Sequence, residues 1–194
     1  MNVAAGMASR AYTDPFHGGG RTVFYRPMGE PGFEALVETH HAEIYRYVRR
    51  VTSRTTEADD LSQETFLRAY RAWPSLPPDA NVRAWLFTIA TNICRNHFRS
   101  ERRRDRAHGV LKAAPVHTNG AGPEEHTLGD ETRALVEAVV ERLPLKQRMA
   151  FLLRKVHELD YETIAATLGC SGDSARAHVF QALRKIRESM EITQ

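Results

Sequence analysis

Cysteine is scarce in this sequence and long apolar runs are absent, and both features exclude whole classes of protein. The 194 residues include two cysteines, Cys94 and Cys170. They lie far apart and outside any CxxC spacing, which argues against a disulfide framework or a structural zinc site and indicates a reducing compartment. No apolar stretch approaches the ~20 residues that cross a membrane, and no signal-peptide pattern opens the chain. We expect a cytoplasmic protein without membrane insertion.

Motifs that carry catalysis or hold cofactors are missing as well. The sequence has no nucleophile elbow, HExxH pair, P-loop or glycine-rich phosphate cradle. The adjacent carboxylates Asp59 and Asp60 lack a histidine at coordinating spacing, so they do not indicate a metal pair. We expect no catalytic residue, no metal site and no cofactor, and a hydrolase is the least favoured hypothesis.

Strand patterns are absent from the whole chain, which predicts an all-α fold. Residues 1–30 combine Gly18–Gly20 with several prolines and no apolar period, a pattern typical of a disordered extension.

The formal net charge of +3 is too small to establish a nucleic-acid partner, so the distribution of charge along the chain has to decide.

Apolar residues at helical spacing predict three helices in the first half of the chain. They span about Phe33–Arg54, Glu57–Trp73 and Asn81–Arg104. Three prolines between the second and third of these helices break the pattern. We assign the three helices to one small domain, residues 31–105.

The second predicted helix begins with a cluster of acidic side chains. Glu57, Asp59, Asp60 and Glu64 lie within eight positions that contain no basic residue. Acidic residues favour the positive end of the helix dipole, which is the structural explanation. The functional alternative is a docking surface for a basic partner, and the negative charge of this face argues against DNA as that partner.

The third predicted helix carries amides and arginines along one side. Positions 95 to 106 contain six arginines and two carboxylates, which gives this segment a local charge of +4. Arginine neutralises phosphate, asparagine reads base edges, and aromatic rings stack on unpaired bases. The stripe therefore favours a nucleic-acid strand, although a solvated helix end is the alternative. Its members are Trp85, Thr88, Asn92, Asn96, Arg99 and Arg103.

A stretch without apolar period, residues 106–129, separates this domain from a second one. Its glycine, proline, histidine and alanine content is typical of a flexible linker. We expect a second helical domain over residues 130–194. It begins with helices over Asp130–Leu143 and Leu145–His157, with a proline between them.

The second domain ends in a predicted helix-turn-helix. Tyr161–Leu168 forms the first helix, Asp160 is placed to cap it, and Gly169 can take the positive φ of a turn. Ser171 or Asp173 can cap the longer second helix. A helix with this polar side can lie in a DNA major groove, although a hairpin with a solvated face is the alternative. The polar side holds Arg176, His178, Gln181, Arg184 and Lys185.

Five sequence blocks, in this order, carry a family resemblance. The first domain contains FEALVETHHAEIYRYVRRV, ADDLSQETFLRAYRAW and RAWLFTIATNICRNHFRSERRR, and the second contains LPLKQRMAFLLRKVHELDYETIAATLG and CSGDSARAHVFQALRKIR. Together they resemble bacterial RNA polymerase sigma factors of the extracytoplasmic-function group, which have two helical domains. The resemblance covers about Phe33 to Met190.

The resemblance implies a sigma factor, which binds core RNA polymerase and directs promoter-specific initiation. In this family the acidic second helix docks on the clamp helices of the largest polymerase subunit, and the flap is a second expected contact. The other implied partners are promoter DNA and an anti-sigma protein. The polymerase contacts implied here are Asp59, Asp60, Leu61, Gln63, Glu64 and Phe66.

The resemblance also implies two DNA-reading surfaces. The third helix is similar to the element that melts and reads the −10 region, and the last helix to the reader of the −35 element. The implied −10 contacts are Arg83, Trp85, Asn92, Asn96, Arg99, Arg102 and Arg103. The implied −35 contacts are Ser174, Arg176, His178, Gln181, Arg184 and Lys185.

Several positions depart from the family pattern. Asn96 stands where Asp is common and Thr91 where a basic residue is common, while His178 and Gln181 replace arginines of the last helix. We therefore transfer no consensus promoter sequence. The alternative function is a helix-turn-helix regulator that acts without polymerase. The acidic helix and the amide–arginine stripe argue against it, because a sensor domain needs neither.

Overall fold

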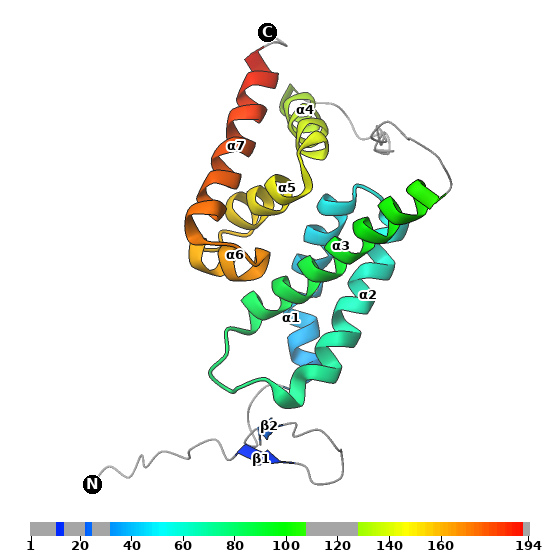
Figure 1. The fold of residues 1–194 in the computed structure, drawn as a ribbon, viewed down its shortest axis with the longest axis vertical. Helices are drawn as coiled ribbons and strands as arrows, with labels where there is room; N and C mark the ends of the chain where they lie inside the picture. The colour runs from blue at the N-terminus through cyan, green and yellow to red at the C-terminus, as the bar shows by residue number, and fades with distance from the viewer. Residues whose placement is uncertain (1–10, 14–21, 25–31, 108–127, 192–194) are drawn as a thin grey trace, which may run out of the picture.

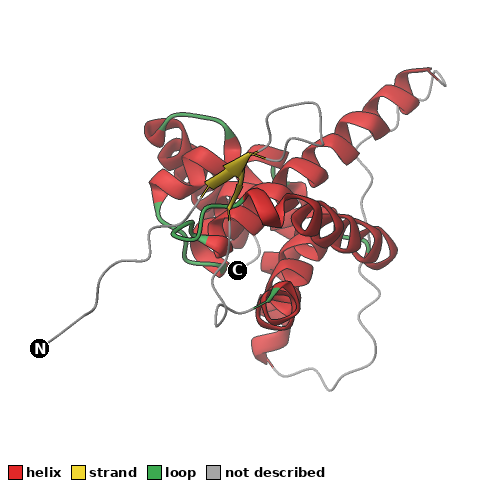
Figure 2. Ribbon diagram, turned by 90° about the horizontal axis from the view of Figure 1, so that it is seen from below, coloured by secondary structure: helices red, strands yellow, loops and turns green. Residues whose placement is uncertain are grey.

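Two helical units make up the described part of the chain. The computed structural model describes residues 11–13, 22–24, 32–107 and 128–191, and these ranges consist of helices, the short turns between them and one short strand pair (Figure 1; Figure 2 shows the same fold from below). The all-α prediction is confirmed. No helix within these ranges is long and apolar enough to cross a membrane.

The strand pair lies in the predicted N-terminal extension. β1 (Ala11–Thr13) pairs antiparallel with β2 (Thr22–Phe24), with Tyr12 opposite Val23. The prediction that no strand occurs in the chain is wrong at these two segments. Aromatic and β-branched residues favour extended backbone, but three residues are too few to show an alternating pattern. The remainder of the predicted disordered extension lies outside the described residues.

The first unit consists of three long helices. α1 (Phe33–Thr52) ends at Ser53, whose φ of 63° turns the chain into α2 (Thr55–Ala72). α2 passes into the short 3-10 helix η1 (Trp73–Ser75), and α3 (Val82–Ala107) follows. The three predicted helices are confirmed to within a few residues. Their apolar faces meet in a core with fully buried Ile44, Tyr47, Val48, Leu86 and Phe87.

The second unit contains four α-helices and a π-helical turn. α4 (Leu128–Arg142) is followed, after Pro144, by α5 (Leu145–Phe151). The predicted helix Leu145–His157 ends instead in η2 (Leu152–Val156), a π-helical turn. α6 (Tyr161–Leu168) and α7 (Gly172–Glu191) then form the helix-turn-helix. Its buried core includes Met149, Leu153, Ile164, Leu168 and Val179.

The signals that delimit the helix-turn-helix are local and were visible in the sequence. The Asp160 side chain accepts a hydrogen bond from the Thr163 amide at 2.8 Å, which confirms the predicted cap. Gly169 has φ of 61° and ends α6. The Ser171 hydroxyl accepts from the Ser174 amide at 3.2 Å, so Ser171 caps α7.

The two units lie side by side in the structure. α6 packs across α3, while α5 and η2 approach α1 (Figure 1). α7 packs on α4, α5 and α6 and lies on the side of the second unit away from α3 (Figure 1). Residues 108–127, which make up most of the predicted linker, lie outside the described residues.

Candidate nucleic-acid interface

The acidic surface of the first unit lies on α2. Asp59, Asp60 and Gln63 are exposed, whereas Glu64 is half-buried and pairs with Arg68 at 2.6 Å. Exposed carboxylates without a neutralising base of their own attract a positively charged partner. This surface therefore has the electrostatic character that the sequence predicted for it.

The apolar members of the same surface differ from those that the resemblance implies. Phe66 is only 9% exposed and its ring stacks on His41 at 5.6 Å, so it belongs to the core. Leu61 is half-buried. Sequence reasoning missed Leu67 and Tyr70, which are 51% and 61% exposed. The acidic surface thus has an apolar extension toward the C-terminal end of α2.

The amide–arginine stripe of α3 is open to solvent from Asn92 onward, whereas Trp85 and Thr88 at its start are half-buried. Asn92, Asn96 and Arg99 are exposed, as are Arg102 and Arg103 beyond them. Because these positions recur every three or four residues, their side chains project from one side of the helix. The structure therefore brings together most of the residues implied at the −10 region.

Trp85 and Arg83, at the start of α3, have different surroundings. Trp85 is half-buried and its ring lies 6.3 Å from that of Trp73. Arg83 donates from Nε to both carboxylate oxygens of Glu43, at 3.0 and 3.1 Å, and from Nη2 to the carbonyl oxygen of His157 at 2.6 Å. Its guanidinium is thus engaged with α1 and with the second unit.

On α7 the exposed polar side includes Arg176, Gln181 and Arg184. Arg176 donates to Asp173 at 3.0 Å and lies over the Tyr161 ring, 5.4 Å from its centroid. The guanidinium carbon of Arg154 also lies over this ring, 4.9 Å from its centroid. Tyr161 of α6 therefore makes cation–π contacts with two guanidinium groups.

Gln147 of α5 fixes two further side chains of α7. Its amide donates to Gln181 at 2.6 Å, and its carbonyl oxygen accepts from Lys185 at 3.1 Å. Since Gln181 accepts through its side-chain oxygen, its amide nitrogen stays available to a base edge. Lys185 is half-buried beside α5, away from the exposed arginines.

Two other implied −35 residues are half-buried. The Ser174 hydroxyl bonds to that of Ser171 at 2.9 Å. Burial, together with the charge of Lys146, lowers the pKa of His178 below the usual histidine value. His178 is therefore neutral at neutral pH and does not add positive charge to the interface.

Phe180 is the α7 residue that sequence reasoning missed. Its side chain is 66% exposed, four residues after Arg176 and four before Arg184. A large apolar side chain between two exposed arginines is the signal that could have identified it. Apolar groups in this setting contact the methyl group of thymine.

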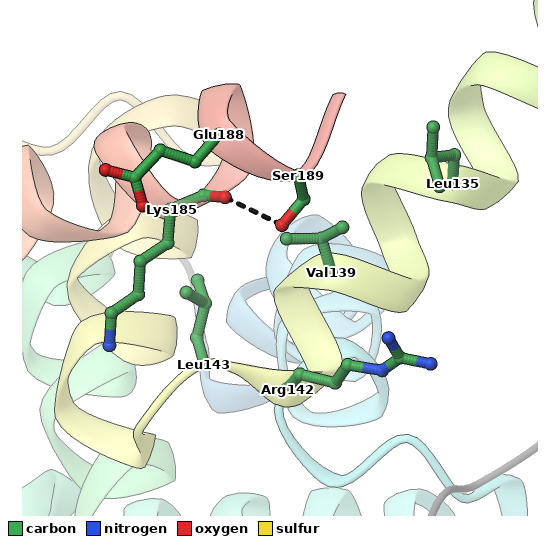
Figure 3. A pocket seen from close by; sticks show the side chains of 7 residues that line it. All are labelled: Leu135, Val139, Arg142, Leu143, Lys185, Glu188 and Ser189. Atoms are coloured by element: carbon green, nitrogen blue, oxygen red, sulfur yellow. Dashed lines mark hydrogen bonds between the residues drawn. The ribbon is translucent and has the colours of Figure 1, made fainter. Parts of the chain in front are cut away.

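An open groove of about 440 Å³ lies between α4 and α7, and Arg176 at the start of α7 does not line it. Its floor is apolar and its rim carries both charge signs, as Figure 3 shows. The Ser189 hydroxyl donates to the Lys185 carbonyl oxygen at 2.9 Å along one side. The lining residues are Leu135, Val139, Arg142, Leu143, Lys185, Glu188 and Ser189.

One cluster in the described residues has the composition of a cation site. Nε2 of His97 lies 3.2 Å from Glu57 and 3.5 Å from Glu101. Arg54 lies 2.5 Å from the Glu57 carboxylate. Because a guanidinium already pairs with these carboxylates, the arrangement fits an ion-pair network better than a metal centre.

Comparisons with known proteins relate both units to one family. The model for sigma-70 region 2 matches residues 36–104, and that for sigma-70 region 4 matches residues 133–186. The ECF RNA polymerase sigma-E factor of Salmonella typhimurium is 32% identical over 169 residues, which cover 84% of this chain and 88% of that protein. The RNA polymerase sigma-H factor of Pseudomonas aeruginosa is 30% identical, with 82% and 86% covered.

A solved structure shares the fold. It is the sigma factor RpoE in complex with the anti-sigma factor NepR from Bartonella quintana. The match has a TM-score of 0.64 and 26% sequence identity, and it covers 84% of this chain and 98% of that chain. The likeness spans both helical units.

Proposed function

Because this chain belongs to the sigma-70 family, in its extracytoplasmic-function group, we propose that it binds core RNA polymerase and directs transcription initiation from a subset of promoters. The observation that carries the proposal is the separation of charge. An acidic surface on α2 and arginine-bearing surfaces on α3 and α7 occupy different helices of one chain. The protein itself performs no reaction and gives the polymerase its promoter specificity in the cytoplasm.

Polymerase docks at two places in this proposal. Asp59, Asp60 and Gln63 of α2 meet the clamp helices of the largest subunit, with Leu67 as the apolar contact in place of buried Phe66. The groove between α4 and α7 receives the polymerase flap. Its position supports this assignment, because an occupant there leaves the exposed side of Arg176 and Phe180 free for DNA.

DNA is read at two places as well. Asn92, Asn96 and Arg99 of α3 hold the melted −10 strand, and capture of unpaired bases offsets an unstacking cost of a few kcal/mol per base step. The exposed side of α7 reads the −35 element in the major groove. When polymerase holds both surfaces and one of them is bound to DNA, the other is kept close to its own promoter element, which raises its effective concentration there. The free protein lacks this advantage, so we expect it to bind promoters poorly.

An anti-sigma protein is the expected regulator. The solved relative was captured with the anti-sigma factor NepR. We propose that a separate protein of this functional class restrains the present chain by covering its polymerase-binding or DNA-reading surfaces.

The test compares binding to purified core polymerase. Asp60→Arg reverses a charge on the acidic surface, and we expect its Kd for core polymerase to rise roughly tenfold, about 1.4 kcal/mol. Glu38→Arg makes the same change at an exposed position of α1 and serves as the matched control. Equal losses in the two variants, or none in either, would remove the support for docking through α2.

A further inference from the structure

The start of α7 carries an exposed ion pair. The Asp173 carboxylate accepts from Nη1 of Arg176 at 3.0 Å, and the two side chains are 96% and 58% exposed. Ser171 already caps the helix through the Ser174 amide, so Asp173 is not required as the cap. An exposed pair on one helix also contributes little to stability. These surroundings suit contact with a partner better than maintenance of the fold.

The neighbouring helix orients the basic member of the pair. The guanidinium carbon of Arg176 lies 5.4 Å from the centroid of the Tyr161 ring, at the start of α6. α6 and α7 pack against each other, so this ring is fixed relative to α7 (Figure 1). The ring and the Asp173 carboxylate together give the guanidinium a defined orientation. Such preorganisation lowers the entropic cost of binding a partner.

The position of the pair within the helix-turn-helix determines which part of DNA it meets. In this motif the second helix enters the major groove, and its N-terminal residues contact the base edges. Asp173 and Arg176 are the second and fifth residues of α7. Arg184 lies two turns further along, where the same helix moves away from the bases. The pair is therefore placed for base contacts.

The hydrogen-bonding groups of the pair match those of one base pair. In the major groove a G·C pair presents the N7 and O6 acceptors of guanine and the N4 donor of cytosine. A guanidinium binds both guanine acceptors, and a carboxylate accepts from cytosine N4. Arg176 has five N–H donors and uses one for Asp173, whose carboxylate retains acceptor positions. The pair thus offers two donors beside an acceptor, as the G·C edge requires.

An A·T pair does not match the same groups. Its major-groove edge carries the N7 acceptor and N6 donor of adenine and the O4 acceptor of thymine. Arg176 would meet a second donor at N6, and Asp173 would meet an acceptor at O4. Two hydrogen bonds would be replaced by two unfavourable contacts, which is the repulsive element that specificity needs.

We propose that Asp173 and Arg176 together read one G·C base pair of the −35 element, with Arg176 on guanine and Asp173 on the cytosine of the same pair. The inference deepens the proposed sigma function and rests on it. Asp173 becomes a specificity-determining residue, and Tyr161 a positioning residue that acts through Arg176. The negative charge of Asp173 is compatible with nearby phosphates because the guanidinium lies 3.0 Å away.

Selection of DNA by reconstituted holoenzyme tests the proposal. The probe is a library of linear duplexes with a random block long enough to hold both promoter elements, incubated with core polymerase and the full chain. Bound duplexes are recovered and sequenced. With the unmodified protein we expect one position of the upstream element to be enriched in G·C in a single orientation.

Three variants address the individual side chains. Asp173→Ala removes the acceptor, and Arg176→Lys keeps the charge but loses the planar fork. Each should reduce the preference for G·C about tenfold at the same position, while the other positions keep their preferences. Tyr161→Leu keeps an apolar side chain without the cation–π contact and should relax that position alone, to a smaller extent. A merely structural role for Tyr161 would lower the melting temperature without changing this one preference.

Glu162→Ala is the matched control. Glu162 is an exposed acid in the first turn of α6, as Asp173 is in α7, so its removal changes the charge and the helix-dipole interaction in the same way. We expect it to leave every base preference unchanged. Retention of the G·C preference in Asp173→Ala would overturn the proposal. So would relaxation of different positions by Asp173→Ala and Arg176→Lys, or equal relaxation of all positions.

The outcomes also separate this inference from the sigma function. Enrichment of promoters by holoenzyme with identical preferences in Asp173→Ala would overturn the G·C reader and leave the sigma function intact. Absence of any core-dependent enrichment would overturn the sigma function. The selection is then repeated with the full chain alone at low salt, where a helix-turn-helix regulator still binds DNA. Absence of a G·C position that depends on Asp173 would overturn the reader there as well.

Discussion

The Tyr47 hydroxyl lies 2.8 Å from the Thr91 hydroxyl in the buried interior of the first helical unit. Both side chains are fully buried, and burial raises the pKa of the Tyr47 phenol. The pair joins α1 to α3 through the core. Threonine suits this position because its hydroxyl has a partner in the core, whereas a long charged side chain would be buried here without solvent.

Loss of this hydrogen bond should destabilise the protein. Tyr47→Phe leaves the Thr91 hydroxyl buried without its partner, and we expect the free energy of unfolding to fall by about 1–3 kcal/mol. Tyr47→Phe combined with Thr91→Val removes both polar groups and should recover part of the loss. Urea unfolding measures both effects. A double variant less stable than the sum of the two single losses would contradict this account.

A single substitution in the turn before α6 should stabilise the protein. Glu158 has φ of 57°, a backbone conformation that costs a side-chain-bearing residue but not glycine. We expect Glu158→Gly to raise the free energy of unfolding by about 0.5–1 kcal/mol. Gly169→Ala, at φ of 61°, makes the reverse change and should lower it. Shifts of the same sign would show that other factors dominate at one of these turns.

Acidification should weaken the folded state through His157 and Glu43. Burial lowers the pKa of His157 despite the nearby Glu43 carboxylate. Burial raises the pKa of Glu43, but hydrogen bonds and charge from Arg83 and His157 outweigh it and leave the pKa below its usual value. In both cases the unfolded chain takes up a proton before the folded chain does, so stability falls as the pH falls.

The histidine contribution begins below its ordinary pKa of about 6.5, and the carboxylate contribution follows at lower pH. We expect the free energy of unfolding to decrease from pH 7.5 to pH 5.5, and His157→Gln to make that decrease smaller. The exposed His41 provides the control substitution, His41→Gln. Urea unfolding at each pH gives the slopes. A slope for His157→Gln equal to that of the unmodified protein would contradict the assignment.

Truncation of Phe180 should weaken promoter binding without affecting polymerase binding. The exposed ring between two arginines is placed for apolar contact with a base, and we expect Phe180→Ala to raise the Kd of reconstituted holoenzyme for promoter duplex about tenfold, ~1.4 kcal/mol. Leu67→Ala truncates an exposed apolar residue of the other unit and should instead weaken core polymerase binding. If both variants weaken the same binding step, whether to promoter duplex or to core polymerase, the two surfaces do not have separate roles.

The helix-turn-helix was predictable from sequence because its signals are local. Asp160, Gly169 and Ser171 each act within three residues of a helix end, and the structure has all three in the expected roles. The apolar period likewise located the three helices of the first unit. Short-range chemistry and helical spacing are therefore sufficient for the fold class and for most element boundaries.

The residues that make up the candidate surfaces were harder to predict from the sequence. Helical period alone assigns Tyr70 to the inner face of α2, but it is 61% exposed because Phe33 covers it only edge-on, at 5.2 Å. The engagement of Arg83 was not predictable, since its partners Glu43 and His157 lie 40 and 74 residues away in the chain. Such contacts depend on how the two units pack, which no local pattern encodes.

Run-off transcription on genomic promoter fragments, with purified core polymerase and this protein, tests the central claim most directly. The account predicts discrete transcripts from a subset of fragments when both components are present, and none from either component alone. Absence of core-dependent initiation on every fragment, together with tight operator binding by the protein without polymerase, would contradict it and favour a helix-turn-helix regulator.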